Sequence, residues 1–389
     1  LVANPTSIVA DGRSTSTITL TLRDANNNLV SGQAVVFSTT QGTVSAATAG
    51  TGANAGTYTA TLTSGTVAGT AIINARVGGA TTNFTGVAVT LAAGAPVAAQ
   101  SRLVANPTSI VSGGAGSLIT LTLRDANNNP VTGQTVTFAS NIGGTFSTVQ
   151  ANANGTYTST FTGTTAGTAS ITARVGGNAF AVTAVNVTVT AGAPATAGSI
   201  LTASTASIVS GGAGSLITLT LRDANNNPVT GQTVTFASNN GGTFSTVQAN
   251  ANGTYTSTFT GTTAGTASIT ARVGGNEFAV TAVNVTVTAG APEVARSSLI
   301  FRPASLWVGD TATMFVSLFD AHNNPITGAE VYVGIRYGHS TEYVVMTDDP
   351  MSAGMYSGRV RRLHTAGSFP IFVRVNGVDI GLESILTVM

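Results

Sequence analysis

Apolar and polar residues alternate along most of this chain. The pattern is clearest in residues 96–193. There, threonine, arginine or asparagine separates positions that we expect to point inward, and these positions are apolar except for one serine. The inward positions are Ile119, Leu121 and Leu123, then Val136 and Phe138, then Tyr157, Ser159 and Phe161, then Ile171, Ala173 and Val175, then Val185, Val187 and Val189. Successive side chains of a strand point to opposite faces of its sheet, so a period of two predicts strands. With a first strand near Leu103–Val111 and a short one near Thr145–Val149, we expect about seven strands in this segment.

Each of these strands has one apolar face and one face rich in threonine. An antiparallel sheet that is covered on one side only has this pattern. Two such sheets packed face to face form an immunoglobulin-like β-sandwich. We find no long segment with an apolar period of 3.6 residues, so the sequence predicts an all-β protein with very little helix.

Three sequence markers recur along the chain. The word R-D-A-N-N-N-P-V-T-G begins at Arg124 and again at Arg222, and variants of it begin at Arg23 and Phe319. Its aspartate recurs at intervals of 101, 98 and 97 residues. A G-x-Y marker and an A-G-T or A-G-S marker recur with it in every one of these repeats. A repeat of about one hundred residues is a whole domain, which is far longer than a solenoid repeat.

The repeat therefore predicts four tandem immunoglobulin-like domains. Domain 1 spans 1–95, domain 2 spans 96–193, domain 3 spans 194–291, and the divergent domain 4 spans 292–389. The joints A-A-G-A-P and T-A-G-A-P are short and contain proline. We expect modest bending at these joints and an elongated rod.

Domains 2 and 3 are almost identical. Between Ser109–Pro194 and Ser207–Pro292 they differ only in Ile142 against Asn240 and Ala179 against Glu277. Such duplication favours a spacer whose length matters more than its chemistry.

The repeated word also resembles the start of a calcium loop. A loop of the EF-hand type that opens at Asp125 needs glycine at its sixth position and glutamate at its twelfth. Those positions hold Pro130 and Val136, and the other three copies lack both residues as well. Asparagine side chains bond nearby backbone and tolerate left-handed geometry, and proline presets φ. A corner between two strands therefore fits better than a looser metal site.

Composition removes several classes of function. The net charge of +1 gives no electrostatic argument for a nucleic-acid partner, and no apolar run approaches the roughly 18 residues of a membrane span. The chain has neither cysteine nor lysine, which excludes disulfides, thiol chemistry and Lys–Asn isopeptide crosslinks. Its three histidines lack a metal-binding spacing and no nucleophile motif occurs, so we expect no enzyme, cofactor or metal site. The chain begins at Leu1 inside a strand-like segment, and we expect a piece of a longer protein.

The order of the markers resembles a known family. The segments S-I-V-S-G-G, I-T-L-T-L-R-D-A-N-N-N-P-V-T-G-Q-T-V-T-F-A-S, G-T-Y-T-S-T-F-T and A-G-T-A-S-I-T-A-R-V look like a bacterial immunoglobulin-like domain of the invasin–intimin type. The resemblance covers domains 1 to 3 fully and domain 4 more loosely. It implies an inverse autotransporter adhesin on the bacterial cell surface, anchored by an outer-membrane β-barrel outside this chain. It also implies a receptor, protein or glycan, on a host cell or another bacterium.

Domain 4 differs from the other three domains in both core and surface residues. The segment 291–389 holds every methionine and histidine, the single tryptophan, and 16 of the 29 charged residues. Exposed aromatic residues and arginine are typical of protein-binding surfaces. The alignment of Asp320 with Asp223 predicts a recognition surface with these candidates: Phe315, Phe319, Tyr332, Arg336, Tyr337, His339, Tyr343, Arg359, Arg361, Arg362, His364 and Phe372.

Other interpretations of domain 4 stay open. It is also consistent with an older repeat whose aromatic residues are covered by loops or by domain 3, and Pro370 within a predicted strand warns of a bend, an edge or a late start. For the whole chain, the alternatives are a structural spacer with its binding tip elsewhere and a self-associating module that pairs through edge strands. In domain 4 the repeated segment has Phe319 and His322 in place of Arg222 and Asn225. We therefore expect a binding surface to begin at this segment.

Overall fold

The computed structural model describes residues 1–79 and 84–389, and the regular structure in them is β. Within these residues the only helices are the short 3-10 turns η1 (Gly52–Asn54), η2 (Ala98–Gln100) and η3 (Val294–Arg296). None of them is long and apolar enough to cross a membrane. The chain divides into two compact units, Leu1–Gly192 and Ala193–Met389, which are described separately. The all-β prediction is confirmed.

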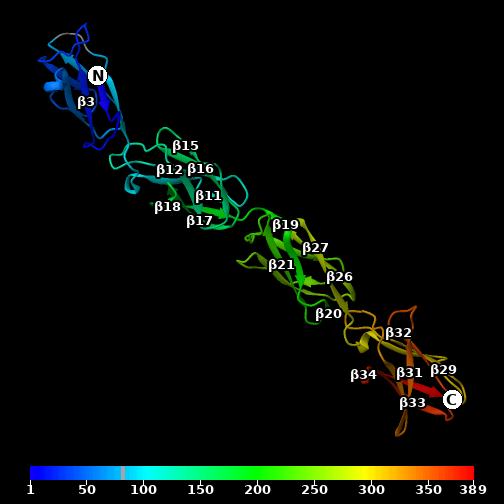
Figure 1. Cartoon of the computed structure of the whole chain (residues 1–389). Coiled ribbons are helices and arrows are strands. Elements are labelled where there is room, and N and C mark those ends of the chain that lie inside the picture. The colour runs from blue at the N-terminus through cyan, green and yellow to red at the C-terminus, as the bar shows by residue number, and fades with distance from the viewer. Residues whose placement is uncertain (80–83) are drawn as a thin grey trace. The chain divides into compact units, whose positions relative to one another are not determined.

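The first unit holds domains 1 and 2, coloured blue to green in Figure 1, and each has two sheets. Domain 1 has sheets β1-β3-β7-β5, with β6 beside β7, and β2-β9-β8-β4. Domain 2 repeats this order as β10-β12-β16-β14, with β15 beside β16, and β11-β18-β17-β13. The strands are β1 (Val2–Asn4), β2 (Ser7–Val9), β3 (Thr15–Thr21), β4 (Val35–Thr39), β5 (Thr43–Val44), β6 (Thr48–Ala49), β7 (Thr57–Thr63), β8 (Gly69–Val77), β9 (Val87–Ala92), β10 (Arg102–Asn106), β11 (Ser109–Val111), β12 (Ser117–Thr122), β13 (Val136–Ser140), β14 (Gly144–Phe146), β15 (Gln150–Ala151), β16 (Thr156–Gly163), β17 (Gly167–Val175) and β18 (Asn178–Thr190).

The second unit holds domains 3 and 4. Domain 3 repeats the two-sheet order as β19-β21-β25-β23, with β24 beside β25, and β20-β27-β26-β22. In domain 4 all seven strands form one path, β28-β29-β32-β31-β30-β33-β34. The strands are β19 (Pro194–Ala203), β20 (Ser207–Val209), β21 (Ser215–Asp223), β22 (Val234–Ser238), β23 (Thr243–Phe244), β24 (Gln248–Ala249), β25 (Thr254–Thr260), β26 (Gly265–Val273), β27 (Asn276–Thr288), β28 (Ser298–Arg302), β29 (Ala312–Ser317), β30 (Val331–Tyr337), β31 (Ser340–Asp348), β32 (Met355–Val360), β33 (Gly367–Val375) and β34 (Val378–Val388).

The period-two pattern identifies the core correctly. Ile119, Leu121 and Phe161 are fully buried in domain 2, and Met314 and Val316 are fully buried in domain 4. The apolar faces of the strands meet in one buried cluster within each of these domains. The immunoglobulin-like sandwich is therefore confirmed.

The predicted first strand near Leu103–Val111 is wrong in one respect. The structure divides it into β10, which pairs antiparallel with β12, and β11, which pairs parallel with β18 in the other sheet. The polar break at Asn106–Pro107 lies where the chain passes between the sheets. Leu103 is the buried residue of β10 and Ile110 that of β11, so the period of two is interrupted at the polar residues between the two strands.

The repeated word forms the corner that the sequence predicts. In domain 2, Asp125 Oδ1 accepts the backbone N–H groups of Asn127 and Asn129 at 2.9 and 2.8 Å. Asn128 takes a left-handed conformation with φ of 65°, which asparagine tolerates better than most residues. An isolated antiparallel bridge between Arg124 and Pro130 closes the turn.

The G-x-Y marker holds this corner against the sandwich. Tyr157 Oη accepts the N–H of Gln134 at 3.0 Å and donates to the carbonyl of Val131 at 3.1 Å. Gly155 has φ of +77°, and a Cβ there would lie 3.0 Å from Pro130 Cβ. The glycine is needed for conformation and close approach, and the tyrosine satisfies backbone groups on the far side of the corner.

We expect the stability of domain 4 to fall in acid because of Asp320 in its corner. Burial of Asp320 opposes ionisation, but hydrogen bonds from Asn324, Gly290 and His322 outweigh it and lower its pKa from 3.8 to about 2. A lowered folded-state pKa gives stabilisation that is complete above the unfolded-state pKa and is lost as the pH falls toward 2. We expect a loss of about 2 kcal/mol over this range.

The carboxyl carbon shift of Asp320 in NMR checks the prediction. A midpoint near the ordinary aspartate value would contradict it. Urea unfolding of the Asp320→Asn chain should lack this acid-dependent component.

Candidate functional site

The outer face of one half of domain 4 carries an ordered set of aromatic and arginine side chains. Tyr332 lies opposite Arg374 across the pairing of β30 with β33, and Gly334 lies opposite Phe372. On the other side of β30, Gly334 lies opposite Tyr343 of β31. We call Tyr332, Arg336, Tyr343, Phe372 and Arg374 the aromatic–arginine face.

The rings of this face contact one another edge to face. Tyr343 lies between Tyr332 and Phe372, with centroid distances of 6.4 and 6.0 Å and interplanar angles of 83° in both pairs. The geometry suits the quadrupoles of aromatic rings. The three rings therefore form one cluster in which Tyr343 packs against both of the others.

The two arginines lie over these rings. Arg336 Cζ is 4.4 Å from the centroid of Phe372, and Arg374 Cζ is 5.6 Å from that of Tyr343. Both distances are within the range of cation–π attraction. Arg374 also donates to Tyr343 Oη at 3.3 Å and to the carbonyl of Gly377. These contacts reduce the freedom of both side chains before any ligand binds.

A glycine makes room for the cluster. Gly334 replaces the Ala237 of domain 3, and a Cβ there would lie 2.4 Å from the ring of Phe372. The ring of Phe372 therefore lies against Gly334 and is only 5% exposed, although it is on the outer face, while Tyr343 is 45% exposed. Phe372 supports the face, and Tyr343 is the aromatic ring most available to a partner.

Charge on the face has a definite distribution. Arg336 lies 3.9 Å from both Asp379 and Glu383 of β34. These are exposed ion pairs, which contribute little to stability but reduce the positive charge at that edge. Tyr332, Tyr343, Arg374 and Gly377 line a shallow hollow of about 200 Å³, and the hollow has no acidic side chain.

A second hollow lies on the other side of β31. Glu342, Tyr343, Val344, Val345, Arg359 and Arg361 line it, with a volume of about 350 Å³. It forms because β31 pairs with β30 along Ser340–Met346 and with β32 only at Thr347 and Asp348. Tyr343 lines both hollows.

The structure brings together half of the predicted candidates. Tyr332, Arg336, Tyr343 and Phe372 form the face, with Arg359 and Arg361 adjacent across β31. The other six lie elsewhere: Phe315 on the outer side of β29, Phe319 at the corner, His339 in the β30–β31 turn, Arg362 and His364 in the segment after β32, and Tyr337 against the buried core of domain 4.

Tyr337 is directed toward the interior. Its ring packs 4.9 Å from Phe369, and burial raises the pKa of its hydroxyl. It follows Val331, Val333 and Ile335 on the inward side of β30. The alternation of β30 gives this orientation, so Tyr337 belongs to the core rather than to the face.

Pro370 lies in β33 beyond Ile371, which is the last residue that pairs with β30, so at Pro370 the strand pairs with β34 only. His322 lies against domain 3, where its Nδ1 is 3.1 Å from Ser210 Oγ. His322 therefore belongs to a contact between domains 3 and 4 rather than to the aromatic–arginine face.

Sequence reasoning missed Arg374. Its segment V-R-V corresponds to the repeated A-R-V of the other domains, with Arg272 at the same position in domain 3, so nothing in the residue itself sets it apart. Its new neighbours Tyr332 and Tyr343 make it part of the face. A comparison of cross-strand neighbours would have found it.

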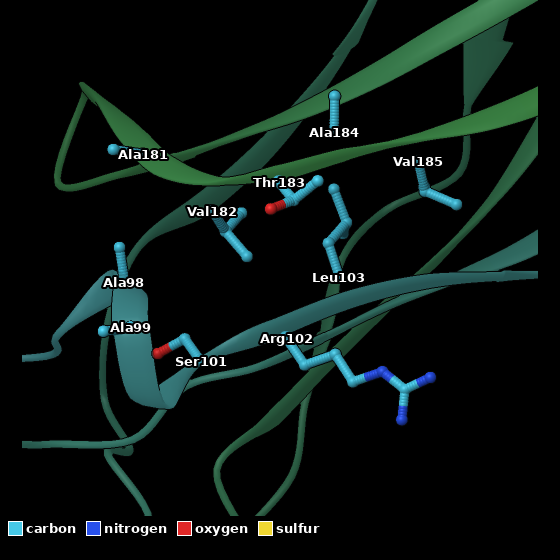
Figure 2. A pocket seen from close by; sticks show the side chains of 10 residues that line it. All are labelled: Ala98, Ala99, Ser101, Arg102, Leu103, Ala181, Val182, Thr183, Ala184 and Val185. Atoms are coloured by element: carbon cyan, nitrogen blue, oxygen red, sulfur yellow. The ribbon is translucent and has the colours of Figure 1, made fainter.

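No group of three or more histidine, cysteine, aspartate or glutamate side chains suited to a metal occurs among residues 1–79 and 84–389. A larger cavity of about 560 Å³ lies in domain 2 between the η2–β10 segment and β18. Figure 2 shows that small aliphatic and hydroxyl side chains line it, with Arg102 as its charged member. Such a lining offers no acid–base pair.

Comparisons with known proteins agree with the fold. FdeC, an Escherichia coli adhesin, is 27% identical and matches with a TM-score of 0.56 over 76% of this chain and 99% of that chain. InvD of Yersinia pseudotuberculosis is also 27% identical, with a TM-score of 0.51 over 75% and 98%. Invasin, a bacterial integrin-binding protein, is 23% identical and shares the fold with a TM-score of 0.50 over 99% and 78%.

The family described as invasin, domain 3, matches residues 1–94, 97–192 and 195–290. These ranges make up well over half of the chain and confirm the resemblance predicted from the repeated segments. The chain belongs to the invasin domain 3 family.

Proposed function

We propose that this chain is an extracellular part of a bacterial cell-surface adhesin. Domains 1 to 3 act as a stalk, and domain 4 contacts a receptor through the aromatic–arginine face. The protein is anchored in the outer membrane by a part outside this chain. The receptor is a protein or glycan on a host cell or another bacterium.

Family membership supports the adhesin assignment. The matched ranges end at residue 290, and FdeC is an adhesin of similar sequence. The near identity of domains 2 and 3 supports a stalk, since a spacer needs length more than distinct chemistry.

The aromatic–arginine face carries the assignment of recognition to domain 4. Domain 3 has Thr235 and Thr270 where domain 4 has Tyr332 and Phe372. Tyrosine and arginine dominate binding energy at protein interfaces because they combine large contact area with directed polar groups. Rings and guanidinium groups that are already stacked lose little freedom on binding.

A pure spacer is the second candidate function. The same duplication of domains 2 and 3 favours it, and it places the binding tip outside this chain. It predicts no saturable binding by any domain and tolerance to deletion of domain 3. Self-association through edge strands would instead appear as aggregation of beads that carry the chain.

Two arginines at equivalent positions, Arg374 in domain 4 and Arg272 in domain 3, allow a matched test of the proposal. Arg374→Ala removes a guanidinium that lies over Tyr343, and we expect binding to cultured mammalian cells to weaken by roughly 5- to 30-fold, about 1–2 kcal/mol. Flow cytometry with the labelled full chain measures this affinity.

Arg272→Ala is the matched control. Arg272 has the same strand position in domain 3 but lies opposite Thr235, where Arg374 lies opposite Tyr332. We expect unchanged affinity for this variant. Equal weakening by both variants would argue against a role of domain 4 in recognition.

A further inference from the structure

The corner of domain 2 does more than turn the chain, because it bonds domain 1. Asn129 Nδ2 donates to the carbonyl of Thr66 at 2.9 Å, and Asn129 Oδ1 accepts the N–H of Ala68 at 2.8 Å. Both amide atoms of one side chain thus bind a single loop of the preceding domain. Asn127 Nδ2 adds a bond to the carbonyl of Ala10 at 3.1 Å.

The linker between these domains binds the same corner. Asp125 Oδ2 accepts the N–H of Gly94 at 2.8 Å and Asn129 Nδ2 at 2.9 Å. The N–H of Val97 donates to the carbonyl of Arg124 at 2.8 Å. The aspartate therefore orients the asparagine and also binds the linker.

The second compact unit repeats this joint between domains 3 and 4. Asn324 Nδ2 donates to the carbonyl of Thr262 at 2.8 Å, and Asn324 Oδ1 accepts the N–H of Ala264 at 2.7 Å. Asp320 Oδ2 accepts the N–H of Gly290 at 2.9 Å. The same atoms have the same roles in both joints, which indicates that the corner is adapted to bind the end loop of the preceding domain.

The joint explains the third sequence marker. Ala68 and Ala264 are the alanines of the A-G-T marker, and it is their backbone N–H groups that bind the asparagine. In both joints the loop itself is recognised through backbone atoms, and in the second joint Asn324 Nδ2 also donates to Ser210 Oγ of domain 3 at 2.9 Å.

Domain 1 carries the same corner with nothing docked on it. Asp24 Oδ1 accepts the N–H groups of Asn26 and Asn28 at 2.9 and 2.8 Å, and Asn28 Nδ2 donates to Asp24 Oδ2 at 3.1 Å. The internal geometry therefore matches that of the occupied corners. Asp24 and Asn28 are exposed, whereas Asp125 and Asn129 are 2% and 5% exposed.

We propose that the Asp24–Asn28 corner is a docking surface for the end loop of another domain of this type, joined in front of Leu1 in the same polypeptide. The occupied joints show its chemistry: a loop carbonyl and N–H two residues apart, plus a glycine N–H from a short linker. The linker bond favours a covalently joined occupant, because attachment raises the effective concentration of the loop to the millimolar range.

The test lengthens the full chain by one domain. A copy of residues 1–102, which contains domain 1 and the complete joint that precedes Leu103, is placed directly before Leu1. We expect the amide of residue 68 in the added copy to exchange with solvent as slowly as Ala68 in the original joint. NMR hydrogen exchange should show it about tenfold slower than Ala366 at the equivalent loop of domain 4.

Asn28→Ala in the original domain 1 should remove this protection. Asn129→Ala, the matched variant at the occupied joint, should release the original Ala68 to the same extent. Exchange of residue 68 of the added copy at the rate of Ala366 would overturn the proposal. Concentration-dependent association of the unextended chain that Asn28→Ala abolishes would also overturn it, because the occupant would then be a second copy.

Discussion

The full chain with Tyr332→Thr and Tyr343→Thr should lose most of its affinity for its receptor. Tyr343 is the exposed ring between the two hollows, and Tyr332 supports it edge to face at 6.4 Å. Central tyrosines of an interface typically cost about 2 kcal/mol or more when removed, roughly 30-fold in affinity. The expected loss for the pair exceeds that of Arg374→Ala, and surface plasmon resonance or cell binding measures it.

The design keeps the domain folded. Threonine suits strands, and domain 3 has threonine at the position of Tyr332. Trp307→Ala is a control for loss of an exposed aromatic side chain, since Trp307 is 65% exposed and lies outside the aromatic–arginine face. If Trp307→Ala weakens binding and the tyrosine pair does not, recognition belongs to a different part of domain 4.

Tyr58→Ala should destabilise domain 1 by about 3–5 kcal/mol. The side chain is 2% exposed in the core, and its hydroxyl accepts the N–H of Gln33 at 2.9 Å. Removal leaves a cavity and an unsatisfied donor at the corner. The loss is comparable with the whole stability of a small domain, about 5–15 kcal/mol. Urea unfolding followed by hydrogen exchange of domain 1 peptides checks it.

Tyr58→Phe separates the two effects. It keeps the ring and removes only the hydroxyl, so we expect a loss of about 1–2 kcal/mol. Both variants should leave receptor binding unchanged, since domain 1 belongs to the proposed stalk. Stability of Tyr58→Ala equal to that of Tyr58→Phe would show that packing of the ring contributes little.

The sequence alone predicts most of the fold for a physical reason. Each sheet is buried on one side, so the alternation of Ile119, Leu121 and Leu123 must appear in the residues themselves. The prediction of a single strand fails at Leu103–Val111, because two short strands of different sheets follow each other so closely across Asn106–Pro107 that together they have the length of one strand.

The candidate site is less predictable because it depends on neighbours across strands. Tyr332 and Phe372 stand out as departures from the threonines of domain 3, but Arg374 does not. Its role depends on β31, whose pairing with β30 brings Tyr343 over the same face. The length of that strand and its crossing to β32 are properties of the folded domain.

The joints depend on atoms that no sequence pattern displays. The word around Asp125 predicts a turn, and that prediction is confirmed by the bonds to Asn127 and Asn129. The partners of Asn129 in domain 1 are backbone atoms of the loop at Thr66 and Ala68. Since any residue supplies such atoms, the sequence could not identify them as partners.

The most direct test compares the full chain with residues 1–290, the part that ends where the family match ends. Binding of each, labelled in the same way, is titrated on the same cells. We predict saturable binding by the full chain and none by residues 1–290. Equal affinity of the two would contradict recognition by domain 4 and would assign binding to the repeated domains.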